Sequence, residues 1–490
     1  MPKKLSTSLL ILFLSVQVGI NHQIVKAQTP ASTVPTTTLK TICPAQLGAA
    51  VDTIINRSEF SRARWGVLVQ NLGSTETLYS RDAQKYFIPA SNTKLLTTAA
   101  ALTELGANYR IRTSVYRDGD RLRVVGRGDP SLTDAQLTTL AKQFKQKGIN
   151  EIKHLMVDDN YFQGDIVNPS WQWEDLQSGD GTPINSLIVD QNSFSFIVSP
   201  QTSGKPLKVI WLNSEQKKQW QIINQSVTVE KNQPSFIKVN RELEGSVLRI
   251  KGQLPEGSQS QFVNLPVFAP AEYFLQRFRS VLAAEKITVK QASVLDSNSK
   301  NEIEELAFIQ SPPLSELVMT ANQDSNNFYT EALLRALAIK KPATKNQSTA
   351  DVGLEVLKST LTQLGVEPTS YVLADGSGLS RKNLISPQAL VQTLQGMAQS
   401  SQAEVFRASL PVAGMSGTLK NRLVDTPATG IVQAKTGTLG GVVTLSGYVN
   451  APGYNPVVFS MMVNQTEQPA RVVRQAMDEI LVMLAQLQRC

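Results

Sequence analysis

The sequence predicts an α+β fold in which one five-stranded antiparallel sheet is covered by helices and interrupted by a long, mostly β insertion. Two strand patterns precede the insertion, at residues 65–72 and 76–80, and three follow it, at residues 430–438, 442–449 and 456–463. Helical patterns lie at both ends of this arrangement. Because sheets and helices bury their apolar faces against one another, these elements fit one layered domain, provided that the chain leaves and rejoins it.

The N-terminal segment differs from the rest of the chain. Two lysines precede a short apolar run at residues 9–19, and small residues suited to a cleavage site end at Ala27. The run is too short to span a bilayer comfortably, so residues 1–27 are expected to be a secretory signal peptide and the mature chain to have no membrane span. Residues 28–42, rich in Pro and Thr, are expected to be a linker.

The predicted domain comprises residues 43–109 and 306–490. Its first part contains a helical pattern at residues 44–55, the strand hairpin, and a helix at residues 91–105 that Gly106 ends. Its second part begins with a helical stretch at residues 312–338. After the last three strands, residues 469–487 place their apolar side chains on one helix face, as expected of a helix that packs on a sheet.

Residues 110–305 form the predicted insertion. An alternating pattern around the Asp118–Gly119 dipeptide indicates a β-hairpin. Further short alternating segments follow, with one clear helix at residues 271–285. We expect this region to be mostly β and to form two subdomains.

Composition narrows the possible functions. The chain has 490 residues, a formal net charge of +8 and no Lys/Arg stripe interleaved with aromatic residues, so nucleic acid is not an expected partner. Two cysteines, Cys43 and Cys490, stand at the two ends of the mature chain. In an exported protein such a pair is expected to form one disulfide, and the alternatives are free thiols or pairing between molecules.

The histidine count argues against two common kinds of site. Of two histidines, His22 leaves with the signal peptide and only His154 remains. A serine–histidine triad would have to use it, and a zinc site of the His/Cys type has too few ligands. We therefore expect a base other than imidazole in any nucleophilic site, and we expect His154 to be structural.

Ser91 is followed three residues later by Lys94, at the start of an apolar helical run. Serine is a favoured N-cap, which alone would explain Ser91. It does not explain Lys94, because the third helical position favours Glu or Gln and a cation there opposes the helix dipole. The same spacing recurs at residues 214–217, 235–238 and 297–300, which are expected in turns or in a strand.

The unfavourable lysine has a chemical use. Residues three apart share a helix face, so the Lys94 amine can reach the Ser91 hydroxyl. Burial, the helix N-terminus and a second cation lower the pKa of a lysine, and a neutral amine can accept the proton of a serine nucleophile. The pair therefore favours a catalytic serine, with simple helix capping as the alternative.

Two further motifs follow in order, Ser325–Asn327 ("SNN") and Lys435–Gly437 ("KTG"). The first lies in or beside a helix and the second at the end of a strand. A strand edge can bind an extended peptide through main-chain hydrogen bonds, and Gly437 would let its backbone approach. Lys435 would supply the second cation and Thr436 a hydroxyl donor, which suits a substrate carboxylate. The ordered trio is typical of β-lactamases and penicillin-binding proteins.

The sequence resembles the D-alanyl-D-alanine carboxypeptidase/endopeptidase group of low-molecular-mass (class C) penicillin-binding proteins. Besides the trio, it carries "GDPSL" at residues 128–132, "DGSGLSR" at 375–381 and "GMSGTLKNRL" at 414–423, which are similar to that group's signatures. The resemblance covers about residue 43 to the C-terminus. It implies a penicillin-binding/β-lactamase-like transpeptidase domain with the long insertion, located in the periplasm or cell envelope.

The resemblance also implies roles for matching residues. Ser91 would attack a D-Ala-D-Ala or related D-centre bond of a peptidoglycan stem peptide, Lys94 would be its general base, and Ser325 would relay a proton to the leaving amine. Substrate would be held by the side chains and backbone of Asn327, Lys435, Thr436, Gly437 and Thr438. The backbone N–H groups of Ser91 and Thr438 would form the oxyanion hole, and β-lactams would inhibit by acylating Ser91. The resemblance implies no metal or organic cofactor.

One residue departs from the pattern, and two other functions remain open. The middle residue of the second motif is Asn326, where the family often has Asp; little effect is expected. A β-lactamase or esterase on the same scaffold needs the same serine and lysine, although the long insertion argues against the compact β-lactamase form. A non-catalytic peptidoglycan-binding protein is the other alternative, against which the intact trio speaks.

Overall fold

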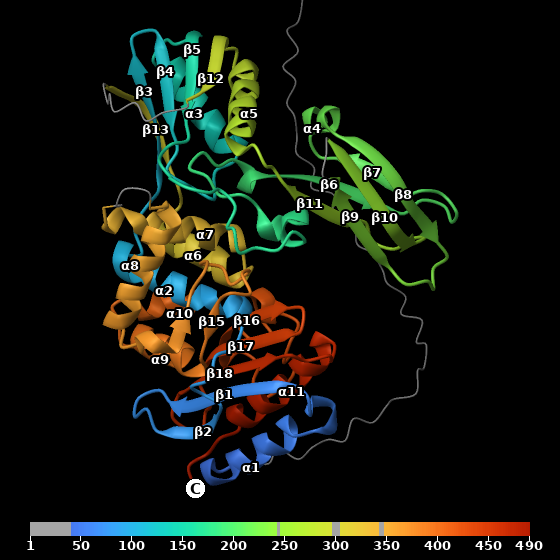
Figure 1. Cartoon of the computed structure of the whole chain (residues 1–490), viewed down its shortest axis with the longest axis vertical. Helices are drawn as coiled ribbons and strands as arrows, with labels where there is room; N and C mark the ends of the chain where they lie inside the picture. Colours follow the sequence, from blue (N-terminus) through green and yellow to red (C-terminus); the bar gives the residue numbers. More distant parts are fainter. Residues whose placement is uncertain (1–40, 243–245, 296–303, 343–346) are drawn as a thin grey trace, which may run out of the picture. The chain divides into compact units, whose positions relative to one another are not determined.

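The structure is a computed structural model that describes residues 41–242, 246–295, 304–342 and 347–490 (Figure 1). The predicted signal peptide, the predicted linker up to residue 40 and the Ser-x-x-Lys copy at residues 297–300 lie outside the described residues.

The central feature is an antiparallel sheet of five strands in the order β16-β17-β18-β1-β2. Its strands are β1 (Arg64–Asn71), β2 (Thr77–Arg81), β16 (Val432–Leu439), β17 (Val442–Val449) and β18 (Val457–Asn464). Two of them precede the insertion and three follow it, so the predicted α+β class and five-stranded sheet are confirmed. β16 is an edge strand of this sheet.

Each face of this sheet is covered by helices, because its strands are apolar on both sides. Along β18, Phe459 and Met461 point into a core shared with α1 (Pro44–Ile55) and α11 (Ala470–Ala485), whereas Val458 and Met462 point into the opposite core. This is the period-two alternation of a strand. The helices of the opposite face are α2 (Thr93–Leu105), α6 (Leu314–Gln323), α7 (Asn327–Ala336), α8 (Thr349–Gln363), α9 (Pro387–Ala398) and α10 (Ala403–Ala408).

The inserted region contains a second five-stranded sheet, of mixed direction, in the order β12-β5-β4-β3-β13. The strands are β3 (Arg112–Asp118), β4 (Arg121–Val125), β5 (Glu151–Asp158), β12 (Thr288–Val294) and β13 (Glu304–Gln310), and helices α3 (Asp134–Gln146) and α5 (Pro270–Ala284) share their core. Because β13 pairs with β3, this sheet extends beyond the expected boundary at residue 305.

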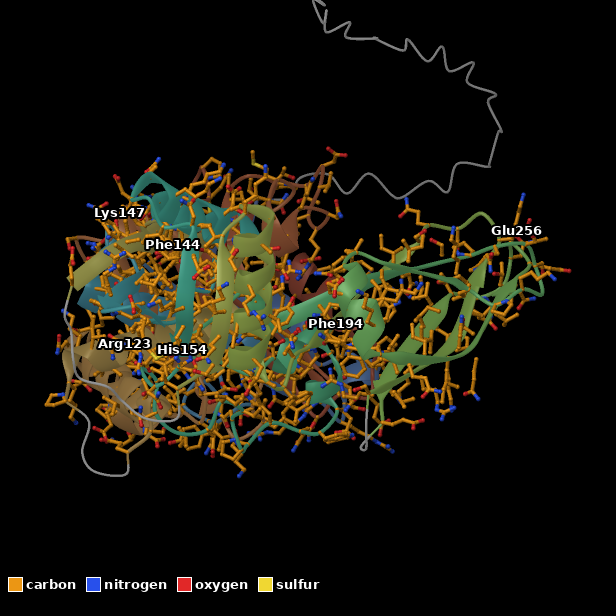
Figure 2. All side chains as sticks on the ribbon, turned by 90° about the horizontal axis from the view of Figure 1, so that it is seen from above. Arg123, Phe144, Lys147, His154, Phe194 and Glu256 are labelled. Atoms are coloured by element: carbon orange, nitrogen blue, oxygen red, sulfur yellow. A yellow bond between two sulfur atoms is a disulfide. The ribbon has the colours of Figure 1, made fainter. Side chains whose placement is uncertain are left out.

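The remaining strands of the insertion form two three-stranded sheets around one small core. They are β6 (Ser193–Ser199), β7 (Lys208–Trp211) and β11 (Gln261–Pro266) in one sheet, and β8 (Gln221–Val229), β9 (Phe236–Arg241) and β10 (Val247–Pro255) in the other, with the short helix α4 (Ser214–Gln219). Figure 2 labels Phe194 and Glu256 in this part and His154 on β5. His154 lies within hydrogen-bonding distance of Ser293 on β12, 2.9 Å from its hydroxyl.

Two expected helices begin or end differently in the structure. The helix expected from Ser91 starts at Thr93, and a 3₁₀ turn, η2 (Ala90–Asn92), precedes it. The helical stretch at residues 312–338 is divided into α6 and α7, because Ser325 adopts a left-handed conformation, with φ of 56°, between them. Both deviations occur at residues of the candidate site.

The two ends of the described chain are joined. Cys43 and Cys490 form a disulfide, with their Cα atoms 5.8 Å apart, and Ile42 forms a β-bridge with Leu487. None of the helices within the described residues has the length and apolar composition needed to cross a bilayer.

Candidate active site

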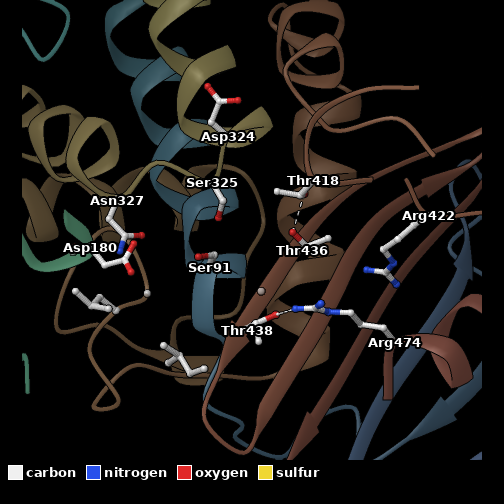
Figure 3. A pocket seen from close by; sticks show the side chains of 14 residues that line it. Ser91, Asp180, Asp324, Ser325, Asn327, Thr418, Arg422, Thr436, Thr438 and Arg474 are labelled. Atoms are coloured by element: carbon white, nitrogen blue, oxygen red, sulfur yellow. Dashed lines mark hydrogen bonds between the residues drawn. The ribbon is translucent and has the colours of Figure 1, made fainter. Parts of the chain in front are cut away.

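The eight predicted catalytic and substrate-binding residues converge on one cleft between η2, the α6–α7 junction and the β16 edge (Figure 3). The cleft has a volume of about 440 Å³. Six of the eight line it, namely Ser91, Ser325, Asn327, Thr436, Gly437 and Thr438. The other two, Lys94 and Lys435, are fully buried and hydrogen-bonded to the lining residues.

Ser91 lies in a turn rather than at the N-cap, which is Asn92. No side-chain hydrogen bond caps the helix, so the capping interpretation of Ser91 is wrong. The preceding residue, Ala90, has a φ of 47°, an uncommon conformation for a residue with a side chain. Such backbone strain is often found at functional sites, and here it presents the Ser91 side chain to the cleft.

The Lys94 amine has three oxygen partners. Its Nζ lies 2.9 Å from Ser91 Oγ, 2.6 Å from Asn327 Oδ1 and 2.7 Å from the main-chain oxygen of Ser377. The amide and main-chain oxygens can only accept hydrogen bonds. When Lys94 is neutral, its two N–H groups donate to these two oxygens, and its lone pair is left to accept the proton of Ser91. The two acceptors thus orient Lys94 as a base.

Burial lowers the pKa of Lys94 to about 8, because desolvation disfavours the ammonium form. The negative charges of Asp375, Asp180 and Glu331 act in the opposite direction and limit the fall. Burial also lowers the pKa of Lys435 well below its ordinary value, and the positive charge of Lys94 lowers it further. A substantial neutral fraction of Lys94 is therefore accessible near neutral pH.

The second motif connects the two lysines. Lys435 Nζ donates to Ser325 Oγ at 2.8 Å and to the main-chain oxygen of Thr436 at 2.9 Å. Two residues after Ser325, Asn327 begins α7 and accepts from Lys94 through its side chain, while its Nδ2 donates to the main-chain oxygen of Asp180 at 3.1 Å. Ser325 therefore lies in the break between α6 and α7 and Asn327 at the start of α7, and each is bonded to one lysine.

The edge strand β16 closes the other side of the cleft. Position 437 has no room for a side chain. A Cβ there would lie 3.0 Å from the Ser91 nitrogen and 2.2 Å from Thr444 Oγ1. The glycine thus lets β16 approach the turn that carries Ser91. Thr436 Oγ1 donates to Thr418 Oγ1 at 2.8 Å, and Thr438 Oγ1 accepts from Arg474 at 3.0 Å, so both threonine hydroxyls are held at the cleft (Figure 3).

The "DGSGLSR" segment supplies the main-chain oxygen of Ser377 that accepts a hydrogen bond from Lys94. Asp375 accepts hydrogen bonds from the backbone of Gly378 and Ser380, which folds the loop. Gly378 has a φ of 85°, and a Cβ there would lie 1.8 Å from the Ala90 oxygen. The buried Glu331 accepts from the Ser377 nitrogen, at 2.9 Å, so the loop presents the Ser377 oxygen to Lys94 from a fixed position.

Sequence reasoning did not identify several residues that line the cleft. They are Asp180, Asp324, Gly378, Leu379, Thr418, Arg422, Leu439 and Arg474. Four of them, Gly378, Leu379, Thr418 and Arg422, belong to quoted signatures to which no role was assigned. Asp180 comes from the insertion and Arg474 from α11, where no motif marks them, so only the tertiary structure identifies them.

The Ser-x-x-Lys copies at residues 214–217 and 235–238 lie outside the cleft lining, and so does Asn326. The prediction that the other Ser-x-x-Lys copies lie in turns or strands is wrong for residues 214–217, which form most of α4 in the insertion. Asn326 caps α7 by accepting from the Tyr329 nitrogen at 3.0 Å and is absent from the cleft.

Together the geometry provides a hydroxyl nucleophile, an adjacent buried amine and a second hydroxyl bonded to a second amine, a set suited to acyl transfer.

The family comparison agrees with this chemistry. The model of the D-Ala-D-Ala carboxypeptidase 3 (S13) family matches residues 47–485. The chain is 33% identical over 463 residues to the D-alanyl-D-alanine carboxypeptidase of Actinomadura sp. (strain R39), covering 90% of this chain and 85% of that protein. It is 28% identical over 458 residues to penicillin-sensitive carboxypeptidase A of Dictyostelium discoideum, covering 86% of this chain and 87% of that protein.

A solved structure has the same fold. The crystal structure of penicillin-binding protein 4 from Haemophilus influenzae aligns with a TM-score of 0.75 at 23% sequence identity, covering 89% of this chain and 98% of that one. At this identity the match concerns the fold, including both the helix-covered sheet and the inserted region.

Proposed function

The chain belongs to the D-Ala-D-Ala carboxypeptidase 3 (S13) family and is a serine DD-peptidase, and we propose that Ser91 is its nucleophile and Lys94 its general base. The observation that carries this assignment is the 2.9 Å contact between Ser91 Oγ and a buried Lys94 amine whose other two partners are acceptors. No other side chain is needed to explain activation of the hydroxyl.

In the proposed acylation, Ser91 Oγ attacks the carbonyl carbon of the penultimate D-Ala and its proton passes to Lys94 Nζ. The oxyanion is stabilised by the backbone N–H groups of Ser91 and Thr438. Each donor of this kind typically lowers the activation free energy by ~3–4 kcal/mol. Ser325, bonded to Lys435 at 2.8 Å, gives its hydroxyl proton to the nitrogen of the leaving D-Ala and takes up the proton held by Lys94, so Lys94 is neutral again once the acyl-enzyme has formed. The C–N bond breaks, and the acyl group stays on Ser91 as an ester.

Deacylation completes the cycle. Water attacks the ester carbonyl and gives a proton to the neutral Lys94. Lys94 returns this proton to Ser91 Oγ as the ester C–O bond breaks, which releases the shortened peptide and restores the free enzyme. A β-lactam acylates Ser91 in the same way, but its leaving nitrogen remains tethered within the opened ring and stays in the cleft. This explains slow release and makes β-lactams covalent inhibitors of the proposed site.

The substrate is proposed to be a peptidoglycan stem peptide with a free C-terminal carboxylate. Thr436 and Thr438 would hold that carboxylate, and Arg474 stands beside Thr438 with its guanidinium 3.0 Å from the hydroxyl. The neighbouring Arg422 is paired with Asp478, whereas no ion pair to a carboxylate joins Arg474 within the described residues. A cation at the end of the cleft suits a substrate that carries a carboxylate on the leaving side of the scissile bond.

Removal of Arg474 is expected to erase much of the preference for a free carboxylate. Wild-type enzyme should hydrolyse a peptide ending in D-Ala-D-Ala with a kcat/KM about 10- to 100-fold above that of the C-terminal amide, since a hydrogen bond to a charged group contributes about 1.5–3 kcal/mol. Arg474→Ala should lower kcat/KM for the acid and leave that of the amide unchanged. Arg471→Ala, on the same helix but outside the cleft lining, is the matched control. Equal rates on acid and amide, unaffected by Arg474→Ala, would contradict the proposed role of Arg474 in binding the substrate carboxylate.

Acylation is expected to accelerate with rising pH. Only the neutral amine accepts the proton of Ser91, and with a pKa of about 8 the neutral fraction of Lys94 rises about tenfold per pH unit below that value. The rate constant for acylation by a fluorescent penicillin should therefore increase about tenfold from pH 6 to pH 7 and level off above about pH 9. A rate that does not change between pH 6 and pH 9 would exclude a neutral Lys94 as the base.

We further propose that the protein acts in the periplasm or cell envelope after export. The Cys43–Cys490 disulfide supports an oxidising compartment. The lysine-plus-apolar pattern of residues 1–27 supports export by a signal peptide.

A further inference from the structure

The insertion contacts the second motif through a side chain that no motif includes. Gln191 lies in the insertion, and its Oε1 accepts a hydrogen bond from Asn326 Nδ2 at 2.8 Å. Asn326 stands between Ser325, which is bonded to Lys435, and Asn327, which is bonded to Lys94. The contact from Gln191 therefore fixes Asn326, and with it the backbone that carries Ser325 and Asn327.

The backbone around Gln191 is strained in an unusual way. Asp190, Gln191 and Asn192 all have left-handed φ angles, of 48°, 52° and 49°. Non-glycine residues adopt this conformation singly and uncommonly, so three in succession persist only where the surroundings impose them.

The surroundings do impose this conformation. The Asp190 carboxylate is paired with Arg277 on α5, at 3.2 Å. Asn192 is fully buried, and its Nδ2 donates to Asn185 Oδ1 at 2.8 Å and to the Pro183 oxygen at 3.0 Å. The turn is thus fixed on both sides of Gln191, whose own side chain extends towards the second motif.

We propose that Gln191 is a positioning residue for acylation, which acts through Asn326 to hold Ser325 and Asn327 against the two buried lysines. This gives the insertion a role in the peptidase reaction, and it rests on the proposed function of Ser91 and Lys94. Gln191 lies outside the cleft lining and acts without touching the substrate.

The test is a double-mutant cycle on the rate constant of acylation by a fluorescent penicillin. Gln191→Ala removes the acceptor, and Asn326→Ser removes the amide donor but keeps an N-cap residue for α7. Each single change should lower the acylation rate constant about 10- to 100-fold, the scale expected when catalytic groups are displaced by about 1 Å. The double variant should lose no more than either single variant, because both changes break the same contact.

Three further measurements separate positioning from general stability. Gln191→Glu keeps an acceptor oxygen and should restore most of the rate. The affinity for the pre-covalent penicillin complex and the melting temperature should change little in Gln191→Ala. Thr349→Ala is the matched control, because Thr349 also bonds to the insertion, accepting from the Gln163 nitrogen at 2.7 Å, but lies outside the second motif.

The outcomes are distinguishable from those for the proposed function. Failure of the wild-type protein to become acylated at Ser91 would overturn the proposed function itself. Normal acylation of the wild type together with an unchanged rate in Gln191→Ala would overturn the positioning role alone. Fully additive losses in the double variant would also overturn it, since Gln191 would then act independently of Asn326.

Discussion

Ser91→Ala is expected to abolish acylation by penicillin and release of D-alanine while leaving the fold intact. The hydroxyl faces an open cleft and is bonded to Lys94, so its removal should cost little stability. Loss of the nucleophile removes the covalent step, and comparable removals in serine peptidases lower kcat by on the order of 10⁶. Labelling with a fluorescent penicillin, followed by gel electrophoresis, measures the effect directly.

A matched serine keeps this test specific. Ser74 is exposed in the turn between β1 and β2, outside the cleft lining, and Ser74→Ala should be labelled like the wild type. A melting temperature within a few degrees of the wild type would verify that Ser91→Ala is folded. Retained labelling of a folded Ser91→Ala protein would refute the assignment of the nucleophile.

Replacement of Lys94 is expected to slow acylation by roughly 10²–10⁴, the contribution typical of a general base. Two variants separate its possible roles. Lys94→Arg keeps a cation and donors for Asn327 and Ser377, but a guanidinium does not deprotonate in proteins. Lys94→Met keeps the length of the side chain and removes the amine. If Lys94 is the base, both variants should lose acylation to a similar degree.

The Lys94→Arg variant distinguishes a general base from a fixed positive charge. If Lys94 serves only as a fixed positive charge, Lys94→Arg should acylate at close to the wild-type rate and only Lys94→Met should be slow. Because Lys94→Met leaves the Asn327 and Ser377 oxygens without their donor, its unfolding temperature has to be measured alongside the rate. Rapid acylation of a stable Lys94→Arg protein would show that a base other than Lys94 operates.

The five-stranded sheet was predictable because its strands and helices have clear periodicities. β17 and β18 are mostly apolar runs bounded by turn signals, and α11 has one apolar face, so local patterns identify each element. The three motifs were predictable as a set because their order matched a known family. Their convergence on one cleft depends on pairing between distant segments, which no local pattern determines.

The deviations from the sequence-based predictions occur where tertiary contacts override local preference. The run from Ser91 favours a helix, yet the approach of β16 at Gly437 and of the loop at Gly378 accompanies a 3₁₀ turn at Ser91. Likewise the 312–338 stretch has helical periodicity throughout, but the left-handed Ser325 divides it. In both places the local rule fails at a residue of the site.

The contributions of the insertion were the least predictable part of the site. Asp180 contacts Asn327 from 147 positions away and Gln191 contacts Asn326 from 135 positions away. Both are ordinary polar residues in loop segments, and a single sequence gives no signal that distinguishes them from other surface residues. The three consecutive left-handed residues around Gln191 become visible only as backbone angles.

Mass spectrometry of peptides from the wild-type protein after exposure to penicillin tests the central claim most directly. If the hydroxyl next to the Lys94 amine is the nucleophile, the penicilloyl group should be found on the peptide that contains Ser91, and fragmentation should place it on that residue. Modification of a different serine, or no covalent adduct on the folded protein, would contradict the account.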